Sequence, residues 1–169
     1  MSKHRILAVD PGTREIGVAV LDGDELIYYA VKTIRERGTA QKVLRQAVAV
    51  VVDLIGAYEP DCLAIEKMFV VQKSAALLSV LAEEIKSAAR GTGLDVYEYA
   101  PTTIRKFICQ TGKATKSDVA KIVAGRYPEL ARHLKAITRW EEKYYANMFD
   151  AVAVGLMCRQ EVSGKAAAA

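Results

Sequence analysis

The chain has 169 residues, a length typical of one domain and sufficient to bury a core of its own. Hydrophobic residues make up 51% and charged residues 26% of the composition, which excludes a disordered chain. The 3 cysteines include no closely spaced pair, which excludes a disulfide framework and a zinc ribbon. No apolar run approaches the ~18 residues of a membrane span, and none resembles a signal-peptide core. We therefore expect a cytoplasmic protein.

The net charge of +4 is unevenly distributed along the chain. Residues 101–143 carry 10 Lys and Arg against 4 Asp and Glu, whereas the rest of the chain is slightly acidic. A basic segment attracts polyanions such as nucleic acid, because bound phosphates release their counterions. A solvated, Lys-rich helix face is the alternative that charge alone leaves open.

The first part of the chain predicts three strands and one helix. Short apolar runs rich in branched residues indicate buried strands, and an Asp-Gly-Asp sequence at 22–24 indicates a hairpin between two of them. Apolar residues at helical spacing, followed by Pro60, predict a helix that ends before this proline. The predicted elements are strands at 5–10, 16–21 and 25–32 and a helix at 39–58.

Beyond Pro60, strands and helices alternate. We predict strands at 62–65 and 94–99 and helices at 74–90, 102–109, 116–127 and 141–160. A hairpin followed by strand–helix–strand crossovers predicts an α/β fold with a mixed sheet, antiparallel on the hairpin side and parallel beyond it. We expect one domain over residues 1–160 and a disordered tail over 161–169.

Two acidic residues stand where predicted strands end. Asp10 closes the first strand and Glu66 closes the fourth. If these strands are parallel neighbours, both carboxylates emerge at one edge of the sheet, where they would repel each other unless a cation binds between them. Hard divalent cations prefer such oxygen ligands. A single strand-end Asp is also common as a turn residue, so it is the pair that indicates a metal site.

The last predicted helix offers a third acid. Its buried stripe follows the i, i+3, i+4, i+7, i+8 pattern through Phe149, Val152, Ala153, Leu156 and Met157. Asp150 lies at the border of this stripe, with Asn147 beside it one turn earlier. A helix packed on the sheet would aim both side chains at the strand edge. The alternative is a solvent-facing Asp near a helix start, where the helix dipole favours it.

These residues belong to four motifs that resemble those of the RuvC-type Holliday-junction resolvases, members of the ribonuclease-H-like superfamily. The motifs occur in the order of that family over about residues 5–158. They are Asp10-Pro11-Gly12-Thr13-Arg14, Ala64-Ile65-Glu66-Lys67-Met68-Phe69, Gly112-Lys113-Ala114-Thr115-Lys116-Ser117 and Asp150-Ala151-Val152-Ala153-Val154.

The resemblance implies a ribonuclease-H-like fold with a five-stranded mixed sheet flanked by helices. It implies a crossover junction endodeoxyribonuclease of DNA recombination and repair, which resolves four-way junctions by paired symmetric nicks. The expected cofactor is Mg²⁺ at a two-metal site, with Mn²⁺ as a substitute. The expected partners are branched DNA, a second copy of the chain and a branch-migration helicase. The Ala/Leu-rich face of helix 74–90 suits a dimer interface, although a two-sided core contact explains it equally well.

The resemblance also implies roles for individual residues. Asp10, Glu66 and Asp150 match the catalytic acids that bind metal. Asn147 stands at a fourth catalytic, metal-binding position where the family commonly has Asp; its carbonyl oxygen can bind a cation but brings no charge. We therefore expect weaker binding of one metal ion and a shift toward Mn²⁺.

The remaining predicted contacts are to DNA. Phe69 matches an aromatic residue that stacks on bases near the crossover, although an aromatic packed under a loop is the alternative. Arg105, Lys113 and Lys116 match basic positions that contact DNA, with Lys commoner than Arg at 105. Trp140 is expected to anchor the last helix rather than bind DNA.

Two further functions remain open at this stage. A related nuclease would prefer flaps or forks to four-way junctions. A junction-binding protein with weak or no catalysis is suggested by Asn147, whereas the three intact acids favour a nuclease.

Overall fold

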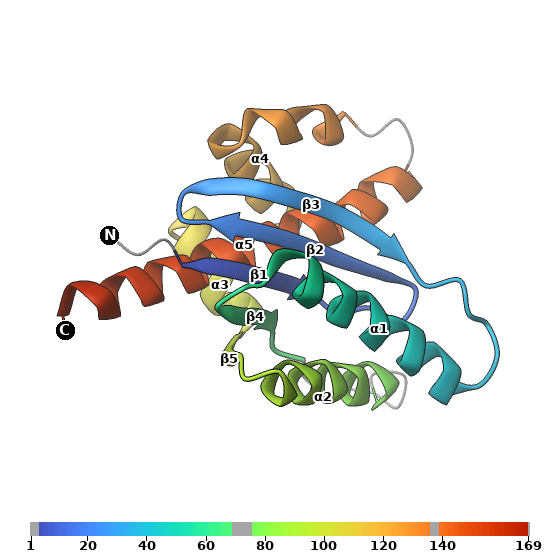
Figure 1. Ribbon diagram of the computed structural model, residues 1–169. Coiled ribbons are helices and arrows are strands. Elements are labelled where there is room, and N and C mark those ends of the chain that lie inside the picture. Colours follow the sequence, from blue (N-terminus) through green and yellow to red (C-terminus); the bar gives the residue numbers. More distant parts are fainter. Residues whose placement is uncertain (1–3, 69–75, 136–138, 169) are drawn as a thin grey trace.

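The computed structural model describes residues 4–68, 76–135 and 139–168. The strands form one five-stranded sheet, and Figure 1 shows helices on both of its faces. The strands are β1 (Arg5–Asp10), β2 (Glu15–Asp22), β3 (Glu25–Thr33), β4 (Cys62–Glu66) and β5 (Asp95–Tyr99), in the order β3-β2-β1-β4-β5. β1, β2 and β3 are antiparallel neighbours, whereas β4 runs parallel to both β1 and β5. The predicted mixed α/β sheet is confirmed.

The helices also begin close to their predicted positions. They are α1 (Ala40–Tyr58), α2 (Ala76–Gly91), α3 (Pro101–Cys109), α4 (Lys116–Arg126), the 3₁₀-helix η2 (Pro128–Leu134) and α5 (Arg139–Ala168). The Thr39 hydroxyl caps α1 by accepting from the Lys42 amide. Thr115 and Asp118 form a reciprocal capping box at α4. The sequence analysis predicted only a break at Pro128, so η2 is an additional element.

The last helix is longer than predicted. α5 continues to Ala168, through the segment expected to be a disordered tail. Val162 is buried, and the Tyr99 hydroxyl donates to Glu161 at 2.8 Å, so β5 holds this part of the helix. The predicted anchoring role of Trp140 is wrong: its side chain is 64% exposed and stacks on Tyr144 of the same helix, with ring centroids 5.0 Å apart.

Alternation along the strands divides the core into two layers. Leu7 and Val9 of β1 face α1 and α2, while Ile6 and Ala8 face α5. α3, α4 and η2 pack on the α5 side, so the sheet is covered on both faces (Figure 1). Asp10 continues the Ile6 and Ala8 series and thus lies on the α5 face of the sheet.

The apolar face of α2 is used within the chain. Its buried residues, Leu81, Ala82, Ile85 and Ala89, pack in the same core layer as α1 and the sheet. Val80 remains 46% exposed. The two-sided core contact therefore accounts for most of this face, and a dimer through α2 stays a prediction.

A glycine permits the close approach of α5 to the sheet. A Cβ placed on Gly17 would lie 1.8 Å from the backbone oxygen of Asn147, a distance no side chain tolerates. Gly17 is also the cross-strand partner of Asp10. The absence of a side chain at this position brings the Asn147 turn of α5 against the end of β1.

Candidate metal and nucleic-acid site

Asp10 and Glu66 end neighbouring parallel strands on one face of the sheet. The register pairs Ala8 with Ala64 and Val9 with Ile65, so both acids follow the same rung of the ladder. Ala8 and Ala64 belong to the α5 side of the core, and alternation directs the acids two residues later to that side as well. Asp10 is only 8% exposed and Glu66 is half-buried. The juxtaposition expected from the sequence is present in the fold.

α5 brings the third acid to the same place. Asp150 is 8% exposed, so the alternative of a solvent-facing Asp is wrong. Asn147 is half-buried one turn before it, with its backbone against Gly17 and therefore beside Asp10. The side chains that lie together thus come from three segments far apart in the sequence.

A lysine from α4 completes this cluster. The Lys116 ammonium donates a hydrogen bond to the Asp150 carboxylate and forms an ion pair with it. Lys116 is the first residue of α4, and the Thr115–Asp118 capping box fixes that helix end. The Lys116 side chain remains 55% exposed, so its ammonium lies between the buried acids and solvent.

The acids carry more negative charge than their protein neighbours offset. Burial raises the pKa of Asp10 well above its usual value, and the carboxylates of Asp150 and Glu66 add to this effect. Burial and Asp150 together raise the pKa of Glu66 to about 7, against the opposing effects of Lys116 and Arg105. Burial alone would lower the pKa of Lys116, but the three surrounding carboxylates raise it above its usual value. Lys116 therefore stays charged at neutral pH.

The donor set suits a hard divalent cation. Carboxylate and amide oxygens are the ligands that such ions prefer, and the raised pKa values of Asp10 and Glu66 reflect a shortage of positive charge. In the described side-chain conformations, no three His, Cys, Asp or Glu residues converge closely enough to hold a metal ion by themselves. The Lys116 ammonium serves as the counter-ion of Asp150 in this arrangement.

The structure describes three of the four predicted DNA-contacting residues, Arg105, Lys113 and Lys116. Arg105, on α3, is half-buried and close enough to lower the pKa of Glu66. Lys113 is exposed in the loop between α3 and α4. Phe69 lies outside the described residues. Sequence reasoning missed the capping role of Asp118, although the Thr-x-x-Asp spacing before α4 was a usable signal.

The raised pKa of Glu66 predicts how stability changes with pH in the metal-free protein. The folded-state value of about 7 exceeds the ordinary value of 4.5, so the stabilisation is complete below 4.5 and is lost as pH rises to 7. At roughly 1.4 kcal/mol per pH unit, the contribution of Glu66 to the free energy of unfolding should fall by at most about 3 kcal/mol. Thermal unfolding in EDTA from pH 5 to 8 measures this fall, and Glu66→Gln should flatten it. An equal slope in the variant would contradict the assignment to Glu66.

Among the described residues, no helix combines the length and apolar character needed to cross a membrane.

Two acids stand at the ends of parallel strands in a mixed sheet, and a third acid lies on a helix packed against them. This arrangement defines a ribonuclease-H-like protein. The comparisons with known proteins give the family within this class. Residues 6–157 match the family described as crossover junction endodeoxyribonuclease RuvC. The chain belongs to this family of junction-resolving endonucleases, and family membership implies dependence on a divalent metal ion.

Individual relatives agree with this assignment. The chain is 34% identical over 128 residues to the crossover junction endodeoxyribonuclease RuvC of Ralstonia pickettii, covering 70% of this chain and 69% of that protein. It is 36% identical over 130 residues to the enzyme of the same name from Chromohalobacter salexigens, covering 70% of this chain and 66% of that protein.

Solved structures share the fold at lower sequence identity. The Thermus thermophilus RuvC structure aligns with a TM-score of 0.75 and 22% identity, covering 95% of this chain and 96% of that one. The yeast mitochondrial Holliday junction resolvase Ydc2 aligns with a TM-score of 0.61 and 10% identity, covering 90% of this chain and 77% of that one. These likenesses confirm the ribonuclease-H-like architecture.

Proposed function

We propose that this protein resolves four-way DNA junctions by paired symmetric nicks, with the cluster of Asp10, Glu66, Asp150 and Asn147 as its catalytic centre. The observation that carries the proposal is the gathering of three acids from β1, β4 and α5 at one sheet edge, with Lys116 on their solvent side. The basic segment 101–143 supplies α3, α4 and η2 around this edge, which favours a DNA partner.

The acids would hold Mg²⁺, with Mn²⁺ as a substitute, and the carbonyl oxygen of Asn147 would be a neutral fourth ligand. Two bound divalent cations supply activation of a water molecule and stabilisation of the departing oxygen in an in-line phosphoryl displacement. The protein contributes the rigid strand ends and the α5 turn that orient the oxygen ligands.

The cationic residues would position the DNA. Lys116 would offset the negative charge that develops at the scissile phosphate. Arg105 and Lys113 would contact the backbone on either side, and Phe69 would stack on a base near the crossover. We assign these roles to a single nuclease domain that extends beyond the expected boundary at residue 160, because Glu161 bonds to Tyr99 and Val162 is buried.

A homodimer fits this function, because a two-fold axis would present two equal sites to two strands of a two-fold symmetric junction. A branch-migration helicase would supply such junctions. Action on DNA junctions also agrees with the predicted cytoplasmic location.

The test is nicking of an end-labelled synthetic four-way junction beside a linear duplex of the same sequence, in Mg²⁺ and in Mn²⁺. Symmetric nicks in the junction alone are the expected result. Tight junction binding without nicks in either metal would favour the junction-binding function that Asn147 suggests. Preferential cutting of flaps or forks in parallel reactions would favour the other alternative.

Replacing Asn147 tests the consequence of its missing charge. Asn147→Asp adds a fourth carboxylate beside Asp10 and should lower the Mg²⁺ concentration for half-maximal nicking by roughly tenfold, an effect of about 1.4 kcal/mol. The same carboxylate should lower Tm in EDTA, because it adds repulsion to a cluster already short of positive charge. Metal titrations of nicking, with and without Mn²⁺, measure the first effect. An unchanged Mg²⁺ requirement would remove Asn147 from the proposed ligand set.

A further inference from the structure

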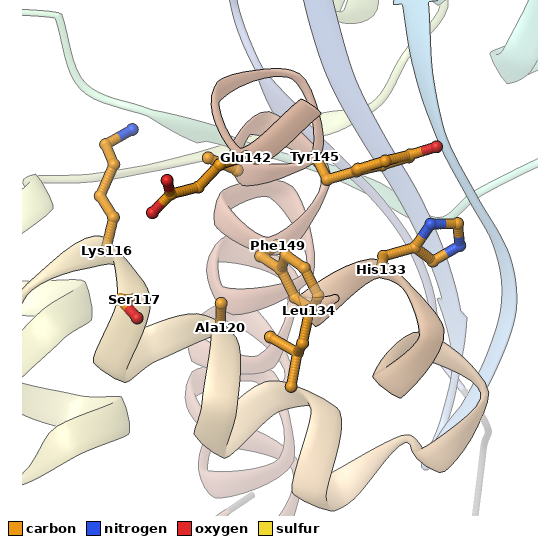
Figure 2. Close-up of a pocket in the computed structure, with 9 residues that line it drawn as sticks. Lys116, Ser117, Ala120, His133, Leu134, Glu142, Tyr145 and Phe149 are labelled. Carbon is orange, nitrogen blue, oxygen red and sulfur yellow. The ribbon is translucent and has the colours of Figure 1, made fainter. Parts of the chain in front are cut away.

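A pocket of about 140 Å³ adjoins the proposed catalytic centre, between α4, η2 and α5 (Figure 2). Lys116 lines this pocket and also pairs with Asp150, so the two sites share a side chain. Phe149 and Ala146 line it as well, and they are the chain neighbours of Asp150 and Asn147. A group bound in the pocket would therefore lie beside the acids.

The inner surface of the pocket is apolar and aromatic. Figure 2 shows Phe149 at its centre, with Leu134 and Ala120 next to it and the rings of His133 and Tyr145 at one side. The His133 and Tyr145 ring centroids are 4.5 Å apart. Burial, together with the charge of Arg132, lowers the pKa of His133 and so favours its neutral ring. Such surroundings suit a flat, neutral ring.

The size of the pocket limits what it can accept. A cavity of roughly 150 Å³ in a protein interior holds one six-membered aromatic ring. At about 140 Å³ this pocket matches the volume of a single ring. Among the DNA bases, the pyrimidines match this size.

A carboxylate at the rim of the pocket adds a preference among the bases. Glu142 lines the pocket from the first turns of α5, and in Figure 2 its carboxylate points toward the side on which Lys116 lies. Within the described part of the chain, the Glu142 carboxylate makes no hydrogen bond or ion pair, so both of its oxygens can accept from a ligand. A carboxylate accepts from the exocyclic amine of cytosine and is repelled by the O4 carbonyl of thymine. Cytosine is the only single-ring DNA base that carries an exocyclic amine.

We propose that this pocket binds one unpaired cytosine of the DNA substrate, in the nucleotide next to the scissile phosphate. Lys116 would hold the phosphate at the acids while the attached base enters the pocket, stacks on the aromatic wall and donates its amine to Glu142. The inference rests on the proposed function, because it takes the scissile phosphate to lie at Asp10, Glu66 and Asp150. It makes Glu142 a specificity-determining residue for the position of the cut.

The test uses immobile four-way junctions that differ only in the base pair on each side of the exchange point, with C, T, A or G in the strand to be cut. We expect nicking at C to exceed nicking at T, A and G by roughly tenfold, the effect of one hydrogen bond to a charged group. In a second measurement, 5-fluorocytosine at the same nucleotide should show a changed ¹⁹F shift on protein binding in EDTA. A junction with 5-fluorouracil there should change little.

Two variants separate the base preference from the fold and from catalysis. Glu142→Gln can accept or donate, so the preference for C over T should fall to near one, whereas Glu129→Gln, an exposed residue of η2 outside the pocket, should leave it unchanged. Ala146→Leu fills the pocket from α5 and should abolish the ¹⁹F change while junction binding persists.

The outcomes distinguish this inference from the proposed function. Junctions that are bound and cut equally well with all four bases, or an unchanged preference in Glu142→Gln, would overturn the cytosine pocket and leave the resolvase function standing. A preference for T would overturn the role of Glu142. Absence of both junction binding and nicking would instead overturn the proposed function.

Discussion

Asp10→Asn should reduce junction nicking by at least about a thousandfold while leaving junction binding nearly intact. Metal-assisted stabilisation of a phosphoryl transition state amounts to several kcal/mol, and each ~1.4 kcal/mol changes the rate tenfold. The amide keeps the shape of the side chain but withdraws a charged ligand from the cluster. Single-turnover nicking at saturating protein, with fluorescence anisotropy of the labelled junction in EDTA, separates rate from binding.

The same substitution should stabilise the metal-free fold. Burial and two neighbouring carboxylates raise the pKa of Asp10, which means that its charged form is unfavourable in the folded state. Removing the ionisable group should raise Tm in EDTA more at high pH than at low pH, because a higher pH favours the charged form of Asp10. Asp53→Asn, an exposed position on α1, is the matched control and should change neither rate nor Tm appreciably. A loss of nicking accompanied by a fall in Tm would point to a structural role for Asp10.

Lys116→Met should lower the nicking rate by about a hundredfold, the typical loss when one preorganised charge at a transition state is removed. The substitution also removes the counter-ion of Asp150, so Tm in EDTA should fall. Divalent cations should nevertheless bind more tightly, because a neighbouring positive charge no longer repels them. A lower nicking rate combined with a higher metal affinity would distinguish Lys116 from a residue that only contacts DNA.

Lys121→Met provides the comparison for this prediction, because Lys121 lies exposed on the same helix. Each variant loses one positive charge near DNA, but only Lys116→Met should slow nicking at saturating junction. The measurement pairs single-turnover rates with isothermal titration of Mn²⁺. Equal effects of the two substitutions would reduce Lys116 to a member of the general basic surface.

The strand ends of the site could be predicted from sequence because local signals define them. The run before Asp10 and the run before Glu66 are short, apolar and interrupted by the acid itself, and helical crossovers make such strands parallel. Alternation then settles the face on which both acids lie. The border position of Asp150 on its helix was also readable, since 3.6-residue periodicity fixes which side chains flank the buried stripe.

What the sequence did not reveal depends on packing between distant segments. The Lys116–Asp150 pair joins residues 34 positions apart, and it forms only because α4 packs beside α5. The pocket beneath Glu142 exists because η2 turns back over α5, and nothing in the local pattern around Pro128 indicates that return. The length of α5 was missed for another reason. Ser163 and Gly164 suggest a break, but the burial of Val162 and the high helix propensity of alanine favour continuation of the helix.

The contact between Gly17 and the backbone of Asn147 limits how the acidic cluster can change over evolution, because it limits where α5 can lie. Each residue of sliding along α5 moves it by about 1.5 Å and turns it by about 100°. Gly17 leaves room for the backbone oxygen of Asn147. It therefore fixes both the position of α5 along its axis and the rotation of α5 about that axis. Any change in this position or rotation would move Asp150 away from both Asp10 and Glu66. The side chain at position 147 can vary without changing this arrangement, whereas Gly17, which has no side chain, fixes where α5 lies against the sheet.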